Sequence, residues 1–213
     1  MSMIDEYEKH KNELWIKKHG NDLVEAIEML ENSSSENPLT LIKMIEKEAR
    51  GEFGVGPEDF FSNPNFAHRL VTIGYKYQSD EAVLENVIST LWHIAERCNV
   101  KTQKVYDFLL SHLYSTNKRI KRFVMYSIPF FPQFDQYELM WEYILSMPKV
   151  PPKDYSMSTF YFAIECRVDN IPNNLKGKII NILEDYMKKS NMENIDIDGY
   201  EKHLHLITKL RMQ

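Results

Sequence analysis

The sequence predicts an all-α protein, built as a right-handed α-solenoid with an N-terminal helical cap. The main observation is a segment that recurs with a period of about 37 residues. Residues 80–94 (DEAVLENVISTLWHI) correspond to residues 117–131 (NKRIKRFVMYSIPFF), and each segment begins with a helix-capping residue. The same register reaches a third capping residue, Asp154, before another helical pattern. A fixed period of this size in a helical sequence is typical of stacked helical pairs, and no segment has a convincing strand pattern.

The corresponding positions of the first two segments predict the core. They pair Val83 with Ile120, Val87 with Val124, Leu91 with Ile128, and Ile94 with Phe131. In the third segment Glu165 falls where an apolar residue is expected. A slip of one residue would instead bury Phe160 and Ile164, so the strict register is expected to decay there.

Residues 1–50 are predicted to form the helical cap. Ser2 is expected to cap a first helix that ends at Gly20, and Asn21 a second helix. Pro38 is expected to open a third helix, where its missing N–H costs nothing. Residues 51–65 are predicted to be a glycine-containing linker with a short helix at 57–61. The spacing of the glycines does not match that of a nucleotide-binding loop, so no such loop is predicted there.

Residues 66–213 are predicted to form the helical repeats, in a single continuous domain. The proline at position 129 is expected to distort the end of one helix. The four expected helical pairs are 66–77 with 81–97, 102–114 with 118–131, 136–145 with 155–167, and 174–188 with 198–210.

Composition favours a cytoplasmic protein. The two cysteines, Cys98 and Cys166, have no metal-binding or disulfide spacing and are predicted to be buried thiols. The N-terminus has no apolar signal sequence, and no apolar run is long enough to cross a bilayer. We therefore expect no membrane partner. The abundance of Asn, Lys, Ile and Tyr is usual in AT-rich genomes and indicates a bacterial source.

Residues 117–124 (NKRIKRFV) resemble the second helix of a HEAT repeat, with a capping residue, an apolar position and a basic residue in order. Residues 80–83 follow the same pattern, except that Leu84 stands where the basic residue belongs. The resemblance covers residues 66–168 and implies an architecture rather than a function. In size and composition the chain is also similar to all-α immunity proteins of bacterial polymorphic toxin systems, which implies neutralisation of a toxin by direct binding.

The first two turns of the helix predicted after Asn117 carry an unusual cluster of cations. Cations at a helix N-terminus oppose the helix dipole, and residues that break a local rule are candidates for a binding site. An alternative is that the cations form salt bridges between repeats, Glu81 with Lys118 and Glu85 with Arg122. We expect three tyrosines to lie near the exposed face of the same helices. The candidate partner-binding residues are Glu85, Lys118, Arg119, Lys121, Arg122, Tyr126, Tyr155 and Tyr161.

These residues predict a non-enzymatic protein that binds a protein partner, such as a toxin domain. No catalytic constellation and no cofactor site is predicted. No metal site is predicted either, because the calcium-loop-like residues 194–205 end in His205, where a bidentate Glu is required. The alternative is a nucleic-acid-binding protein resembling HEAT-like alkylpurine DNA glycosylases. The net charge of −5 disfavours it. The oligomeric state is not indicated.

Overall fold

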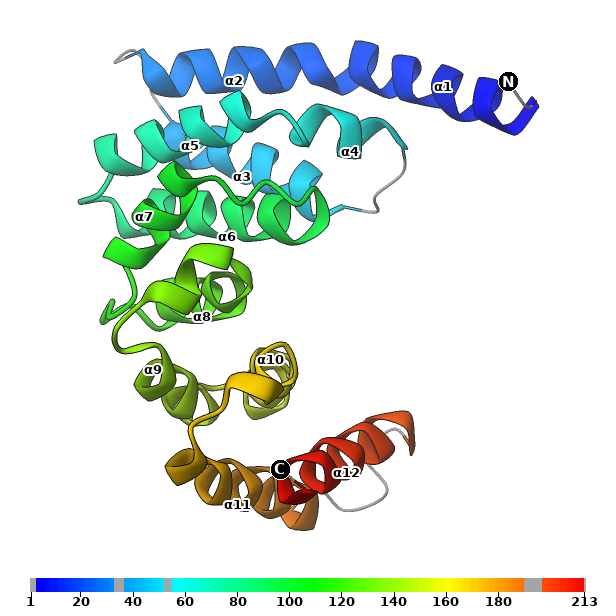
Figure 1. The fold of residues 1–213 in the computed structure, drawn as a ribbon. Coiled ribbons are helices and arrows are strands. Elements are labelled where there is room, and N and C mark those ends of the chain that lie inside the picture. The colour runs from blue at the N-terminus through cyan, green and yellow to red at the C-terminus, as the bar shows by residue number, and fades with distance from the viewer. Residues whose placement is uncertain (1–2, 33–36, 52–54, 190–196, 213) are drawn as a thin grey trace. The chain divides into compact units, whose positions relative to one another are not determined.

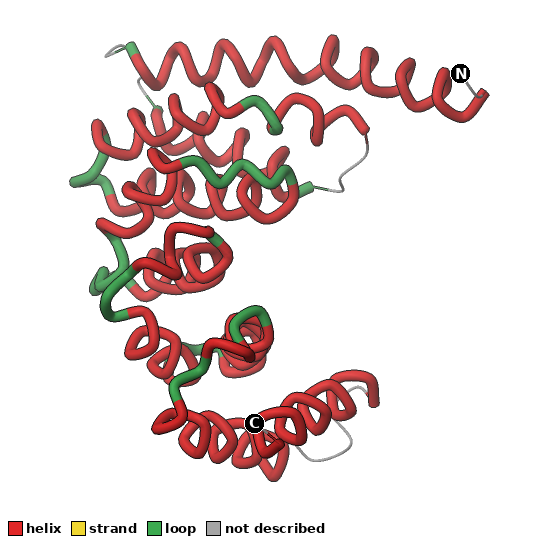
Figure 2. The backbone as a smooth tube through the Cα atoms, in the orientation of Figure 1, coloured by secondary structure: helices red, strands yellow, loops and turns green. Residues whose placement is uncertain are grey.

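The computed structural model describes residues 3–32, 37–51, 55–189 and 197–212. Over these residues it consists of helices and loops without a strand, so the predicted all-α class is confirmed (Figure 2). No described helix is long and apolar enough to cross a membrane. The helices are α1 (Met3–Trp15), η1 (Ile16–Gly20), α2 (Asn21–Glu31), α3 (Pro38–Arg50), α4 (Val55–Phe61), α5 (Pro64–Lys76), α6 (Glu81–Arg97), α7 (Gln103–Ser111), α8 (Lys118–Ser127), η2 (Ile128–Phe130), η3 (Pro132–Gln136), α9 (Met140–Ser146), η4 (Met147–Lys149), α10 (Lys153–Glu165), η5 (Val168–Asn170), α11 (Asn173–Lys189) and α12 (Ile197–Met212).

The chain divides into two compact units, Met1–Gln133 and Phe134–Gln213. In the first unit the helices form two layers (Figure 1). One layer contains α2, α5 and α7, each packed on the next, and the other contains α3, α6 and α8 in the same way. Contacts of α2 with α3 and of α5 with α6 join the layers. The helices of the predicted cap therefore pack within this unit, α2 on α5 and α3 on α6.

The apolar positions predicted for the two repeated segments lie in α6, in α8 and just after α8, and they belong to the core of the first unit. All eight are at most 2% exposed. Both helices are also capped as predicted. The Asp80 carboxylate accepts hydrogen bonds from the backbone N–H groups of Ala82 and Val83, and the Asn117 side chain accepts from those of Arg119 and Ile120. These bonds satisfy donors that a helix start leaves unpaired.

The third expected cap is wrong. Helix α10 begins at Lys153, so Asp154 lies inside its first turn, and the residue before the helix is Pro152, which offers no side-chain acceptor. The predicted slip of register is nevertheless confirmed, because Phe160 and Ile164 are fully buried. Cys166, at the end of this helix, is exposed rather than buried.

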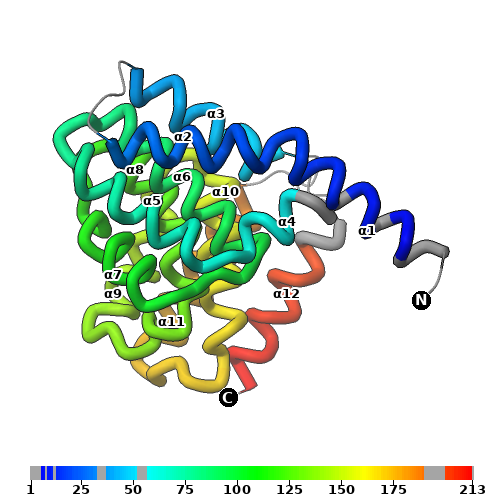
Figure 3. Tube along the Cα trace, turned by 90° about the horizontal axis from the view of Figure 1, so that it is seen from above, coloured from blue at the N-terminus to red at the C-terminus, as the bar shows by residue number. Residues whose placement is uncertain are grey.

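The first two predicted helices are one helix, which runs through η1 without a break (Figure 3). Gly20 ends no helix, because its φ of −60° is right-handed and helical, whereas a glycine stop requires a positive φ. A Cβ there would lie 3.6 Å from the Phe60 ring of α4, which is an ordinary van der Waals distance. Asn21 is itself helical and caps nothing. Ser2 lies outside the described residues.

Pro38 opens α3 as predicted, after a cap by the Asn37 side chain. Helix α8 ends at Ser127, two residues before Pro129, and a short 3₁₀ turn follows. The ring of Pro129 cannot continue the α-helical hydrogen bonding, which explains the predicted distortion.

Cations of α5 and α6 satisfy helix ends in neighbouring helices. The Lys76 amine donates to the carbonyl oxygens of Leu30 and Glu31, both at 2.9 Å, at the end of α2. Arg97 donates in the same way to the carbonyl oxygens of Arg50 and Gly51 at the end of α3. The last carbonyls of a helix lack intrahelical donors and carry its negative end, so these contacts stabilise the stacking of both layers.

Candidate functional site

The start of α8 combines four cations in five positions, with no acidic residue anywhere in the helix. Lys118 and Arg119 are exposed, and Lys121 and Arg122 are partly exposed. The Lys118 and Lys121 amines lie within 4 Å of no carboxylate among the described residues. The first turn of α8 therefore presents positive charge to solvent, at the helix end that already favours anions.

Arg119 is held by a carboxylate of the neighbouring helix. Its Nη1 atom lies 2.8 Å from Oε1 of Glu85 on α6, and the Arg119 side chain remains 64% exposed while that of Glu85 is 13% exposed. Burial raises the pKa of Glu85 above its usual value, although Arg119, Arg122 and Lys43 oppose that shift. The pair brings together two of the predicted binding residues.

One of the two expected salt bridges, that of Glu81 with Lys118, is wrong, because Glu81 instead accepts a hydrogen bond from the Asn117 side chain. Glu85 forms its ion pair with Arg119, and the positive charge of Arg122 also acts on Glu85. An ion pair between the two helices therefore exists, and it engages Arg119.

A partly exposed aromatic pair, which the sequence did not single out, lies on the same side of these helices. The ring centroid of Trp92 lies 5.6 Å from that of Phe123, and the rings are stacked. Glu85 and Trp92 are two turns apart on α6. On α8, Arg122 and Phe123 follow Arg119 by three and four residues. At these helical spacings the residues of each helix share one face. We call this surface the α6–α8 face, defined by Glu85, Trp92, Arg119, Arg122 and Phe123.

His93 lies beneath the α6–α8 face. It is 4% exposed, its ring contacts Trp92, and its Nδ1 atom has no hydrogen-bond partner among the described residues. Burial, together with the positive charges of Arg97 and Arg50, lowers the pKa of His93 to about 4. The imidazole is therefore neutral near pH 7 and adds no charge to the face above it.

Two of the three tyrosines expected on an exposed face are buried. Tyr126 is 8% exposed, because its ring packs against Trp92. Tyr161 is 4% exposed, its ring contacts that of His203 on α12, and its hydroxyl donates to Glu165. Burial and Glu165 raise the pKa of Tyr161 well above its usual range. Tyr155 alone is exposed as predicted, at 67%.

Tyr155 and Tyr161 belong to the second unit, whereas the other candidate residues belong to the first. The α6–α8 face is therefore built from the first unit alone. It retains Glu85, Arg119 and Arg122 of the predicted set and gains Trp92 and Phe123.

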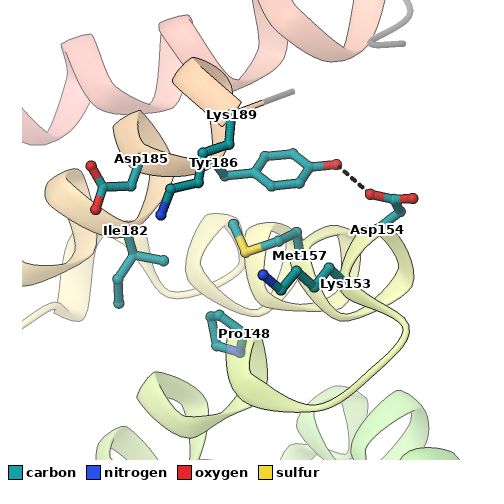
Figure 4. A pocket seen from close by; sticks show the side chains of 8 residues that line it. All are labelled: Pro148, Lys153, Asp154, Met157, Ile182, Asp185, Tyr186 and Lys189. Carbon is teal, nitrogen blue, oxygen red and sulfur yellow. Dashed lines mark hydrogen bonds between the residues drawn. The ribbon is translucent and has the colours of Figure 1, made fainter. Parts of the chain in front are cut away.

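The second unit contains a pocket of about 720 Å³ between η4, the start of α10 and the C-terminal half of α11. Figure 4 shows the Lys153 and Lys189 side chains entering it from the two helices, over Met157 and Ile182. The Tyr186 hydroxyl bridges the helices by a 3.3 Å hydrogen bond to the Asp154 carboxylate. With Asp185, two carboxylates balance the two amines, so the lining favours neither sign of ligand charge. The eight lining residues are Pro148, Lys153, Asp154, Met157, Ile182, Asp185, Tyr186 and Lys189.

No three His, Cys, Asp or Glu side chains gather at a metal-binding distance in the part of the chain that the structure describes. Of the calcium-loop-like stretch, residues 194–196 lie outside that part, and the rest begins α12. Comparisons with protein-family models, with curated proteins and with solved structures find no match to the chain. The function must therefore be argued from the residues themselves.

Proposed function

We propose that the protein is an α-solenoid without enzymatic activity that binds another protein through its α6–α8 face. The observation that carries this proposal is the cationic start of α8 beside the partly exposed Trp92–Phe123 pair. Arginine and tryptophan are the side chains most often found at the energetic centre of protein interfaces. A positive surface beside them favours a partner whose own surface is acidic.

The solenoid rests on the two layers of the first unit and on the shared caps of α6 and α8. In a solenoid, each helical pair buries its apolar face against the next pair, which leaves one continuous layer of helices as a binding surface. Helices α3, α6 and α8 would form that layer here. The 37-residue repeat is proposed for residues 66–213.

Within this class we propose a toxin-neutralising immunity protein. An immunity protein acts by occupying the toxin surface and needs no catalytic group. The cations of α8 would accelerate encounter with an acidic toxin surface, and Trp92 would supply apolar contact area once the two proteins meet.

Nucleic acid is the competing ligand class, since cations beside aromatic rings also suit a single strand. The arrangement of charge favours protein. Glu85 lies within the α6–α8 face and Glu81 beside it, and both carboxylates would repel a continuous phosphate backbone.

The experiment is affinity purification of the tagged full chain from its native host, followed by mass spectrometry. The variants are R119E/R122E and, as a matched double charge reversal elsewhere in the first unit, K17E/K18E, whose lysines are exposed on η1. We expect one protein partner with the wild type and with K17E/K18E, and at least about 30-fold weaker binding of that partner by R119E/R122E.

A thermal unfolding curve for each variant separates loss of binding from loss of fold, and R119Q/R122Q repeats the test without placing new carboxylates beside Glu85. Undiminished recovery of the same partner by both α8 variants contradicts the proposed surface. Recovery of nucleic acid in place of protein, with affinity falling steeply between 50 and 200 mM salt, supports the competing class. If the partner is a toxin, its expression alone arrests growth, and co-expression of the wild type restores it.

A further inference from the structure

The layer of α3, α6 and α8 contains two arginine–glutamate pairs, one between helices and one within a helix. Besides Arg119 with Glu85, Arg50 of α3 pairs with Glu46 at 3.3 Å. In each pair the carboxylate side chain is 13% exposed, while the arginine is more than 60% exposed. A half-buried carboxylate thus holds an exposed guanidinium on α3 as well as on α8. We call these pairs the α3 clamp (Glu46 and Arg50) and the α8 clamp (Glu85 and Arg119).

Helix α6 lies between the two clamps. Its Ser89 hydroxyl donates to Oε1 of Glu46 at 3.1 Å, and Glu85, one turn earlier, makes the ion pair to α8. Helix α6 packs on α3 and on α8, so the two flank it. Neighbouring helices lie 8–10 Å apart, which places the two guanidinium groups on the order of 20 Å from each other.

We infer that both clamps bind acidic side chains of one polypeptide partner, so that the binding surface extends from the α6–α8 face across to α3. This inference rests on the proposed function and adds the second contact. A separation of about 20 Å is too large for one small anion, yet well within a standard protein interface. Glu46 and Glu85 lie in the same surface. A folded partner can place its own cations or apolar groups opposite these carboxylates, whereas a polyphosphate has only negative groups to place there.

Oligoglutamate peptides of three and ten residues test the inference on the full chain in low salt, by fluorescence anisotropy of a labelled peptide. The extended three-residue peptide spans roughly 10 Å and reaches one clamp, while the ten-residue peptide spans roughly 33 Å and reaches both. Engaging the second clamp becomes intramolecular, so we expect the longer peptide to bind at least about 10-fold more tightly.

The variants are R50Q, R119Q and the matched control K17Q/K18Q. We expect R50Q and R119Q each to weaken binding of the ten-residue peptide by about 5-fold or more, because a guanidinium–carboxylate contact is lost, while the control leaves it unchanged. R50Q should also reduce the advantage of the longer peptide over the shorter one.

If R50Q binds the ten-residue peptide as tightly as the wild type does, the inference is overturned. If R119Q still weakens that binding, the proposed function survives. The reverse result, loss in R50Q but not in R119Q, overturns both, as does the absence of saturable binding by the wild type. An oligodeoxythymidylate of equal charge that binds more tightly than the ten-residue peptide overturns the choice of a polypeptide.

Discussion

The two helix layers of the first unit use their charged residues differently. In the layer of α2, α5 and α7, Arg69 makes two hydrogen bonds to the Glu31 carboxylate, at 2.8 and 2.7 Å, and Lys76 satisfies the end of α2. In the layer of α3, α6 and α8, Arg50 and Arg119 are each more than 60% exposed. Arg69 and Lys76 thus join helices of the first layer. In the second layer Arg97 of α6 does the same at the end of α3, but Arg50 and Arg119 remain accessible to a partner.

This difference extends to packing. Gly74 of α5 faces Phe108 of α7, which is fully buried, so the two helices approach closely. Helices α6 and α8 instead meet through Trp92 and Phe123, both partly exposed. The contact of α5 with α7 is tight at Gly74, while the contact of α6 with α8 leaves part of two aromatic rings exposed. Substitutions in the first layer should therefore affect stability, and substitutions on the outer face of the second should affect binding.

The largest effect is expected at Gly74. A Cβ there would lie 2.8 Å from Cε2 of Phe108 and closer still to Cζ, so G74A must displace a buried ring. We expect G74A to lower the free energy of unfolding by about 2–3 kcal/mol, measured by urea denaturation. The control is G177A in α11, where a Cβ meets nothing within 4 Å. That change should stabilise by about 0.5–1 kcal/mol, because glycine is unfavourable inside a helix. Equal effects at the two positions would contradict the close contact of α5 and α7.

The second effect is a pH dependence from His93. Its pKa is about 4 in the folded protein, against about 6.5 in an unfolded chain, so between these values only the unfolded chain takes up the proton. The unfolding free energy should therefore fall as the pH drops from 6.5 to 4, by up to about 3 kcal/mol. H93L removes this contribution, and the difference between wild type and H93L across that range isolates it from other groups. A difference that does not change with pH would show that His93 is not held neutral.

A smaller effect is expected for the ion pair that joins α2 to α5. R69A removes both hydrogen bonds to Glu31, whose pKa the Arg69 hydrogen bonds lower. Because both side chains are about one third exposed, we expect a loss of roughly 1 kcal/mol in the unfolding free energy. The slope of the unfolding free energy against denaturant concentration should stay unchanged. An unchanged slope shows that a local interaction was lost and that the compactness of the folded and unfolded states did not change.

The smallest effect on stability is expected for R119A, on the order of 0.5 kcal/mol or less, because the Arg119 side chain is largely exposed. The same measurement as for R69A gives the comparison directly. If R119A costs as much as R69A, Arg119 joins helices in the way that Arg69 does, and the contrast between the layers disappears.

The sequence was most informative about the core. The apolar positions of α6 and α8, and the caps at Asp80 and Asn117, were predictable because a helical period and a capping side chain are local properties. Gly20 misled because glycine also occurs inside a helix, with right-handed backbone angles. The expected cap at Asp154 was wrong because the helix begins at Lys153, two residues before the expected start. These errors all concern boundaries, which depend on neighbouring segments.

The candidate site was only partly predictable. The cations of α8 stand out because they oppose the helix dipole, and the sequence also indicated an ion pair to α6. It did not indicate Trp92, because an aromatic residue at helical spacing is as consistent with the core as with a surface. Tyr126 and Tyr161 were expected to be exposed, but their burial depends on the contacts with Trp92 and His203, which lie outside their own helices. The contact of the α3 clamp with α6 required the structure, because Glu46 meets Ser89 across 43 positions of sequence.

The most direct test of the account is hydrogen exchange of the full chain, measured by mass spectrometry with and without the partner recovered by affinity purification. The account predicts slower exchange in peptides from α8 and from the second half of α6, with η1 unchanged. Slower exchange confined to η1 and α2, or to the second unit, with α6 and α8 unaffected, would contradict the claim that the α6–α8 face is the binding surface.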